Sequence, residues 1–201
     1  MSETETASFP PFNGYITVSK DASIGMINLR GALNSKGLGL AVGKSLPKER
    51  SILDAKHMQV AWMSPDELMV LCPKENVAKL EADFQKSLES QHALVADVSD
   101  ARAVFTLKGA NVREVVAKLA PVDMAPGHFG TGEMRRTRFG QIAAAFWMTA
   151  DDEVKIICFR SVAEYMYQQL CVCAAQGSEL DLWTQLGDFS QSWLFGLDDG
   201  G

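Results

Sequence analysis

The chain has 201 residues, of which 47% are hydrophobic and 22% charged, and its formal net charge at pH 7 is −6. This length and composition are ordinary for a globular protein and suffice for one domain or for two small halves that share a core. The negative charge disfavours nonspecific binding to nucleic acid or to anionic membranes, because both depend on positive protein surface.

The sequence carries no sign of membrane insertion or secretion. Its apolar runs stay well short of the roughly 20 residues that a helix needs to cross a bilayer. The first residues, MSETETASF, are acidic and polar and lack the order of a signal peptide. We therefore expect a cytoplasmic protein whose four cysteines, Cys72, Cys158, Cys171 and Cys173, are buried structural thiols.

Residues 1–13 are expected to be mobile, and residues 14–92 form the first of two predicted α+β halves. Pro65 suits the first central position of a turn, which predicts a hairpin over Met58–Cys72. Pro73 suits the first turn of a helix, because its missing N–H has no intrahelical partner there. The predicted elements are strands over 14–18, 24–30, 58–63 and 68–72, a glycine-weakened helix from Asn34 or Ser35 to Val42, and a helix from Pro73 to about Ser90.

The stretch from residue 94 to residue 119 is predicted to organise the rest of the chain. Leu94–Val98 and Ala103–Lys108 are short apolar runs typical of strands, and the polar turn Ser99–Ala101 separates them. Apolar residues then recur at helical spacing between Val112 and Leu119. We expect one unit of strand, tight turn, strand and helix, whose apolar side the remaining elements must cover.

Residues 93–177 form the second predicted half. Strands are expected over 133–138, 141–149 and 154–159, followed by a helix. Ser161 and Glu164 have the spacing of a capping box for this helix, and Gly177 can end it. The two halves have similar element order, which predicts an α+β fold of two similar halves of antiparallel strands with packed helices.

Residues 178–201 form an unusually apolar C-terminal tail. Leu182, Leu186 and Phe189 share helical spacing with Trp193, and Trp183 adds further apolar surface. Such a surface needs something to cover it. Two interpretations stay open, namely packing against the same chain or docking on a partner subunit, where tryptophan is a common anchor.

The sequence contains no complete catalytic or metal-binding motif. His57, His92 and His128 are far apart and show no metal-ligand spacing. The glycines of residues 37–43 resemble a dinucleotide fingerprint, and Gly43-Lys44-Ser45 the end of a phosphate loop, but both spacings depart from the motifs. We therefore predict no catalytic and no metal-binding residue.

Arginines supply the candidate contact residues. Arg102 follows the turn Ser99–Ala101, where it either pairs with Asp100 or contacts an anion. Arg135, Arg136 and Arg138 either lie on a solvated strand face or contact an acidic partner or an anionic ligand. The predicted interface residues are Arg102, Arg135, Arg136, Arg138, Trp183 and Trp193.

Several short motifs, in order, resemble the gamma subunit of heterotetrameric sarcosine oxidase. The resemblance runs from about Ile24 to Gln176. Its motifs are Leu29-Arg30-Gly31, Ala61-Trp62-Met63-Ser64-Pro65-Asp66-Glu67-Leu68, Val95-Ala96-Asp97-Val98-Ser99-Asp100-Ala101-Arg102-Ala103-Val104, Pro121-Val122-Asp123, Arg136-Thr137 with Gly140, and Phe159-Arg160-Ser161.

This resemblance implies a fold like the folate-binding domain of the glycine-cleavage T protein, and a place in a complex that oxidatively demethylates sarcosine to glycine. It further implies that larger partner subunits carry FAD, FMN, NAD and the folate site, that a small subunit holds zinc, and that this chain binds no cofactor and contributes no catalytic residue. The alternative is a free-standing folate-binding or folate-dependent one-carbon transfer protein, for which Asp97, Asp100 and Asp123 are the available carboxylates.

Overall fold

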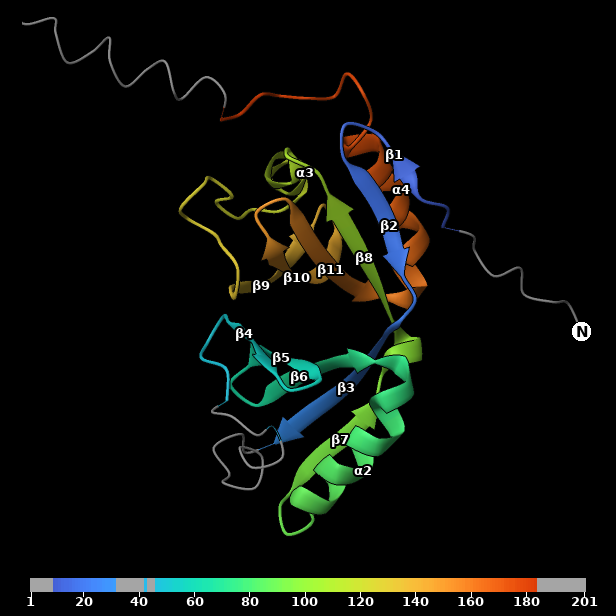
Figure 1. Cartoon of the computed structure of the whole chain (residues 1–201), viewed down its shortest axis with the longest axis vertical. Helices are drawn as coiled ribbons and strands as arrows, with labels where there is room; N and C mark the ends of the chain where they lie inside the picture. Colours follow the sequence, from blue (N-terminus) through green and yellow to red (C-terminus); the bar gives the residue numbers. More distant parts are fainter. Residues whose placement is uncertain (1–8, 32–41, 43–45, 184–201) are drawn as a thin grey trace, which may run out of the picture.

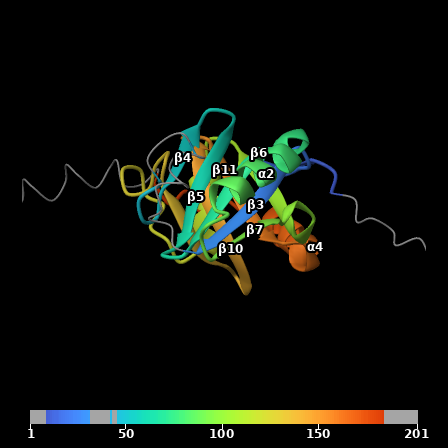
Figure 2. The ribbon, with the colours of Figure 1, turned by 90° about the horizontal axis from the view of Figure 1, so that it is seen from below.

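The computed structural model describes residues 9–31, 42 and 46–183. Within these residues the backbone forms two antiparallel sheets that lie against each other, with helices on their outer faces (Figure 1). Seen from below, the five-stranded sheet lies in front of the six-stranded sheet (Figure 2). The predicted α+β fold of two antiparallel halves with packed helices is confirmed.

In both sheets the spatial order of the strands differs from their order along the chain. From edge to edge, the six-stranded sheet contains β1 (Phe12–Asn13), β2 (Thr17–Asp21), β8 (Arg102–Lys108), β11 (Glu153–Phe159), β10 (Ile142–Ala150) and β9 (Met134–Phe139). The five-stranded sheet contains β4 (Ile52–Ala55), β5 (Met58–Ser64), β6 (Glu67–Pro73), β3 (Ile24–Gly31) and β7 (Ala93–Asp97). The helices are α2 (Val77–Ser87), α3 (Val112–Leu119) and α4 (Ala163–Cys173), with 3₁₀ turns η1 (Lys74–Asn76), η2 (Ser99–Ala101) and η3 (Arg160–Val162).

Three apolar clusters hold these layers together. One lies between α3, α4 and the six-stranded sheet, one between the two sheets, and one between the five-stranded sheet and α2. Strand β8 serves two of them, because Val104 belongs to the cluster between the sheets while Phe105 and Leu107 belong to the cluster under the helices. Neighbouring side chains of β8 thus point to opposite faces of the sheet, as in any β-strand.

The predicted hairpin and the predicted central helix are confirmed. Strands β5 and β6 pair around the turn that contains Pro65 and Asp66, with Ser64 opposite Glu67. Helix α3 has the predicted bounds. The helix after Pro73 begins later than predicted, because η1 comes first and α2 starts only at Val77.

The two strands around Ser99–Ala101 do not form the predicted unit. β7 pairs with β3 of the five-stranded sheet, with Asp97 opposite Ile27. β8 pairs with β2 and β11 of the six-stranded sheet. The turn therefore carries the chain from one sheet to the other, which its local sequence pattern does not indicate.

The sheets also do not divide the chain at residue 92, where the predicted halves meet. β2 lies in the six-stranded sheet, where Val18 faces Leu107 across the ladder and both are buried under the helices. β7 lies in the five-stranded sheet. The six-stranded sheet therefore takes β1 and β2 from before the predicted boundary, and the five-stranded sheet takes β7 from beyond it. Strands β2 and β7 do so because they pair with partners distant in sequence.

Smaller differences concern one strand and one helix start. β4 lies outside the predicted strands and pairs with β5. Val162 rather than Ser161 is the N-cap of α4 and has no side-chain cap, so the predicted capping box is wrong. Of the predicted helix from Asn34 or Ser35 to Val42, only Val42 lies within the described residues, and it is buried. Among the helices that the structure describes, none combines the length and the apolarity of a transmembrane span.

Candidate functional site

A pocket of about 280 Å³ lies at one end of the space between the two sheets. Its charged lining consists of Arg102, Arg136, Arg138 and Glu67. Arg102 opens β8, and strand pairing places it opposite Phe159, the last residue of β11. The structure therefore brings together three of the four arginines that the sequence suggested.

Strand pleating explains why these side chains meet. Arg136 and Arg138 lie on the same face of β9 as Met134, because the three follow one another at every second position, and Met134 belongs to the cluster between the sheets. Arg102 shares its face of β8 with Val104, which belongs to the same cluster. The three arginines thus lie where the apolar cluster between the sheets gives way to a charged rim.

Glu67 neutralises one of these arginines. Its side chain is 9% exposed, and its Oε2 lies 3.3 Å from a guanidinium nitrogen of Arg136. Its Oε1 accepts a hydrogen bond of 3.0 Å from the side-chain amide of Asn28. Glu67 is therefore held on both oxygens.

Arg102 has no such partner among the residues that the structure describes. Its guanidinium lies over the ring of Phe159, with Cζ 3.7 Å from the ring centroid, and its Nε is buried without a hydrogen-bond partner in the described part of the chain. Burial lowers the pKa of Arg102, while the nearby Glu67 carboxylate acts in the opposite direction. The predicted pair with Asp100 is not formed, because the Asp100 carboxylate lies instead 3.6 Å from Lys74 and 3.7 Å from Arg160.

Arg135 does not join the other three arginines. It lies on the opposite face of β9, where its guanidinium is 3.1 Å from Glu133 and 5.1 Å from the ring centroid of Phe129. It lines a second, more open pocket of about 610 Å³, together with His128 and Asp123, which contact each other at 2.8 Å. Arg136 lines both pockets.

Of the two predicted tryptophan contacts, one is described. Trp183 is partly buried and packs against the cluster under the helices, so it lies on its own chain. Trp193 and the rest of the tail from residue 184 lie outside the described residues.

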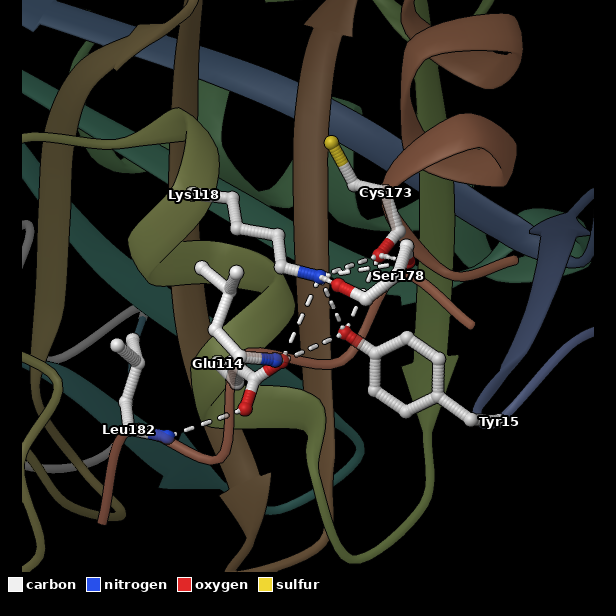
Figure 3. A network of polar contacts seen from close by, with 7 residues as sticks. Tyr15, Glu114, Lys118, Cys173, Ser178 and Leu182 are labelled. Atoms are coloured by element: carbon white, nitrogen blue, oxygen red, sulfur yellow. Dashed lines mark hydrogen bonds and ion pairs between the residues drawn. The ribbon is translucent and has the colours of Figure 1, made fainter. Parts of the chain in front are cut away.

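A buried polar network joins the two ends of the described chain, and sequence reasoning missed it (Figure 3). At its centre, Lys118 of α3 lies 3.4 Å from the Glu114 carboxylate, with side chains only 11% and 3% exposed. Lys118 donates to the Tyr15 hydroxyl at 2.8 Å and to the Cys173 carbonyl at 3.1 Å. It also donates to the Ser178 carbonyl.

Glu114 fixes the segment that follows α4. Its carboxylate accepts backbone N–H bonds from Leu180 at 2.7 Å and from Leu182 at 3.4 Å. Burial raises the pKa of Glu114, but these bonds and those from Tyr15 and Lys118 outweigh it, so the pKa lies below its usual value. The spacing of four residues between Glu114 and Lys118 is a helical ion-pair signal that could have indicated the pair.

The cysteines are partly as predicted. Cys72 and Cys158 are buried, whereas Cys171 and Cys173 are partly exposed, which corrects the expectation for the latter two. All four are free thiols, and burial raises the pKa of each, for Cys158 to about 11. Within the described ranges no three or more His, Cys, Asp or Glu side chains are grouped so as to hold a metal ion.

This difference in burial predicts the order in which the thiols react. At pH about 8, a thiol with a pKa of about 11 is ionised in roughly one molecule in a thousand, and only the thiolate is nucleophilic. We expect iodoacetamide to modify Cys171 and Cys173 at least about ten-fold faster than Cys158 in the native chain. Peptide mapping by mass spectrometry measures the rates, and the denatured chain is the control in which all four should react alike. Equal rates in the native chain would contradict the described burial.

Comparison with known proteins gives a family and two similar structures. Residues 32–176 match the model of a family described as sarcosine oxidase, gamma subunit family. The heterotetrameric sarcosine oxidase from Corynebacterium sp. U-96, solved in complex with pyrrole 2-carboxylate, matches with a TM-score of 0.74 and 25% identity, over 82% of this chain and 87% of that chain. No curated protein matches the sequence.

The second structure supports the fold alone. The glycine cleavage system aminomethyltransferase T from Bartonella henselae matches with a TM-score of 0.58 and 14% identity. The match covers 79% of this chain but only 46% of that one. The arrangement of two antiparallel sheets with packed helices is thus shared with part of a larger enzyme.

Proposed function

The chain belongs to the sarcosine oxidase gamma subunit family, and we propose that within such an oxidoreductase complex it supports assembly and contributes no catalytic residue. The observation that carries this proposal is the extent of the match. The family model covers residues 32–176, and the structural match spans most of both chains, so the similarity concerns a whole subunit.

We propose the partners and cofactors that the resemblance to this family implies. The complex oxidatively demethylates sarcosine to glycine, larger subunits hold FAD, FMN, NAD and folate, and a small subunit holds zinc, while this chain holds none of them. Arg135 is partly exposed and Arg136 is exposed beside the more open pocket, and both are candidates for contact with a partner subunit. The tail from residue 184, which contains Trp193, is a second candidate.

A folate site between the sheets does not fit the described residues. The space there is filled by an apolar cluster that includes Met26, Met69, Trp147 and Ile157, all less than 5% exposed. Each of the carboxylates that could face a pterin already contacts other residues of the chain. Asp97 accepts hydrogen bonds from Ser99, Asp100 pairs with Lys74 and Arg160, and Asp123 contacts His128. The free-standing folate protein therefore gains no support from this geometry.

Co-purification tests the proposed function. The full-length chain, tagged in its native host, is expected to recover larger flavin-containing subunits, and the recovered complex should produce peroxide when sarcosine is added. The chain expressed alone should produce none. Recovery of the chain without partners would contradict the proposal, and so would sarcosine-dependent peroxide formation by the isolated chain.

A matched control variant distinguishes a specific interface from nonspecific electrostatic association. Lys79 lies exposed on α2, which covers the outer face of the five-stranded sheet, and Arg135 lies beside the more open pocket. We expect Lys79→Met to leave subunit recovery unchanged and Arg135→Met to lower it. An equal loss for both variants would indicate that recovery follows total charge rather than the proposed surface.

A further inference from the structure

The pocket between the sheets holds more positive charge than its own carboxylate can balance. Three guanidinium groups line it against the single carboxylate of Glu67, and the ion pair of Glu67 goes to Arg136. Among the described residues, neither Arg102 nor Arg138 lies within ion-pair distance of a carboxylate. This surplus is unusual in a chain with a net charge of −6.

Arg102 is the group that most needs a counterion. Its Nε is buried without a hydrogen-bond partner among the described residues, and a buried donor without a hydrogen bond costs free energy. The Arg102 guanidinium lines the pocket, where a ligand acceptor can pair with it. Phe159 already covers one face of the guanidinium, so an acceptor must approach in the plane of its N–H groups. In-plane approach by two oxygens is the geometry that a carboxylate offers to arginine.

The remaining walls define the body of the ligand. They are mainly apolar. Besides Phe159, Thr137 and Cys158, they include residues of four strands, namely Met63, Met69, Ala143, Ala144, Ala145 and Ile157. The volume of about 280 Å³ falls just below the roughly 300–1,000 Å³ of pockets for drug-sized ligands. A short carbon chain fits both the size and the lining.

We propose that this pocket binds a small carboxylate, whose carboxylate group pairs with Arg102 and Arg138 and whose short carbon chain lies against the methionine and alanine walls. The site goes beyond the proposed assembly role, since it concerns a ligand of this chain itself. Glu67 acts as a positioning residue that holds Arg136 at the rim through their ion pair.

Methionine methyl groups report directly on this pocket. Met63 and Met69 line it, whereas Met166 lies in the cluster under the helices. The full-length chain, labelled with ¹³C in its methionine methyls, is titrated with sodium butyrate and followed by NMR, with signals assigned through single Met→Leu variants. We expect the signals of Met63 and Met69 to shift in a saturable way and that of Met166 to stay in place.

Two control solutes define the chemistry. Butyramide has the same shape without the charge and should cause no saturable shift. Sodium chloride at equal concentration should cause none either. The proposal is overturned if butyrate causes no shift at Met63 and Met69, or if butyramide or chloride reproduces the shift.

Variants of Arg102 and Arg138 test the role of these two arginines. Arg102→Met and Arg138→Met should each weaken butyrate binding at least about ten-fold, because a charge-assisted bond to the carboxylate is lost. Arg102→Lys keeps the charge without the planar fork and should fall between Arg102→Met and the wild type. Lys79→Met removes one charge from an exposed position on α2 and should change binding less than about two-fold. Arg138 is exposed, so its variant is expected to fold even if Arg102→Met does not.

An acidic side chain of a partner subunit is the competing occupant. In that case the chain alone would not respond to butyrate, while Arg138→Met would lower the recovery of larger subunits in co-purification. That pair of results would overturn the small-carboxylate site and leave the proposed function intact. Conversely, the chain could purify without partners and still bind butyrate through Arg102. That result would contradict the assembly role and support the small-carboxylate site.

Discussion

Replacing Lys118 by methionine is expected to lower the free energy of unfolding by about 3 kcal/mol, because it leaves the buried Glu114 carboxylate without its cation. The substitution also removes the hydrogen bonds that Lys118 donates to the Tyr15 hydroxyl and to the Cys173 carbonyl. Urea denaturation followed by far-UV circular dichroism measures the change. Lys79→Met, an exposed lysine variant, should stay within about 0.5 kcal/mol of the wild type.

The double variant separates the charge from the packing. Adding Glu114→Gln to Lys118→Met removes the uncompensated carboxylate and should recover part of the lost stability. In Lys118→Met, amide hydrogen exchange at Leu180 and Leu182 should also accelerate, because both amides donate to Glu114. A Lys118→Met variant as stable as the wild type would show that the network contributes nothing net.

The pH dependence follows from the directions of the pKa shifts. The pKa of Glu114 is lower in the folded chain than in the unfolded chain, where it is near 4.5. The contribution of the Glu114 carboxylate to folding stability is therefore fully present above the unfolded pKa, and it is lost as the pH falls through the folded pKa. Burial lowers the pKa of Lys118, but its interactions with Tyr15 and Glu114 raise the pKa by more. The pKa of Lys118 therefore lies above its usual value. Its contribution is therefore present below about pH 10.5 and is lost as the pH rises through the folded value. The difference between wild type and Lys118→Met should be largest near neutral pH and shrink at both ends.

Local periodicity predicted the elements well, and strand partners poorly. Alternation within β8 and helical spacing within α3 are properties of neighbouring residues, so both could be read directly from the sequence. Whether β7 and β8 join one sheet or two depends on partners far along the chain, such as Ile27 opposite Asp97. A short polar turn is compatible with either outcome.

The same limit applies to the candidate site. The spacing of Arg136 and Arg138 places them on one face of a strand and separates them from Arg135, which the sequence alone could have shown. Their meeting with Arg102 depends on the register of β8, β11, β10 and β9, which brings distant residues to one end of the sheet. Tyr15 likewise reaches Glu114 only through the fold, since the two are 99 residues apart.

The second large loss of stability is expected for a substitution of Trp147, which packs between the two sheets. This side chain is 1% exposed in the cluster between the sheets, so Trp147→Ala should lower the free energy of unfolding by about 4 kcal/mol. Trp147→Phe should cost only about 1 kcal/mol, because it also removes the indole N–H, which is buried without a partner in the described residues. Denaturation followed by circular dichroism measures both, and Tyr165→Ala, an aromatic residue 57% exposed on α4, is the matched control.

The shape of the transition is as informative as its midpoint. Met26 and Met69 reach this cluster from the five-stranded sheet, and Val104 and Trp147 reach it from the six-stranded sheet. Because both sheets bury side chains in one cluster, we expect them to unfold together in a single transition for the wild type and for Trp147→Phe. Two separate transitions in the wild type would mean that the sheets are independent units. In that case, the apolar cluster between the sheets would no longer argue against the entry of a ligand such as folate between them. A single transition would instead leave the arginine-lined pocket at the end of this cluster as the place where a small ligand can enter.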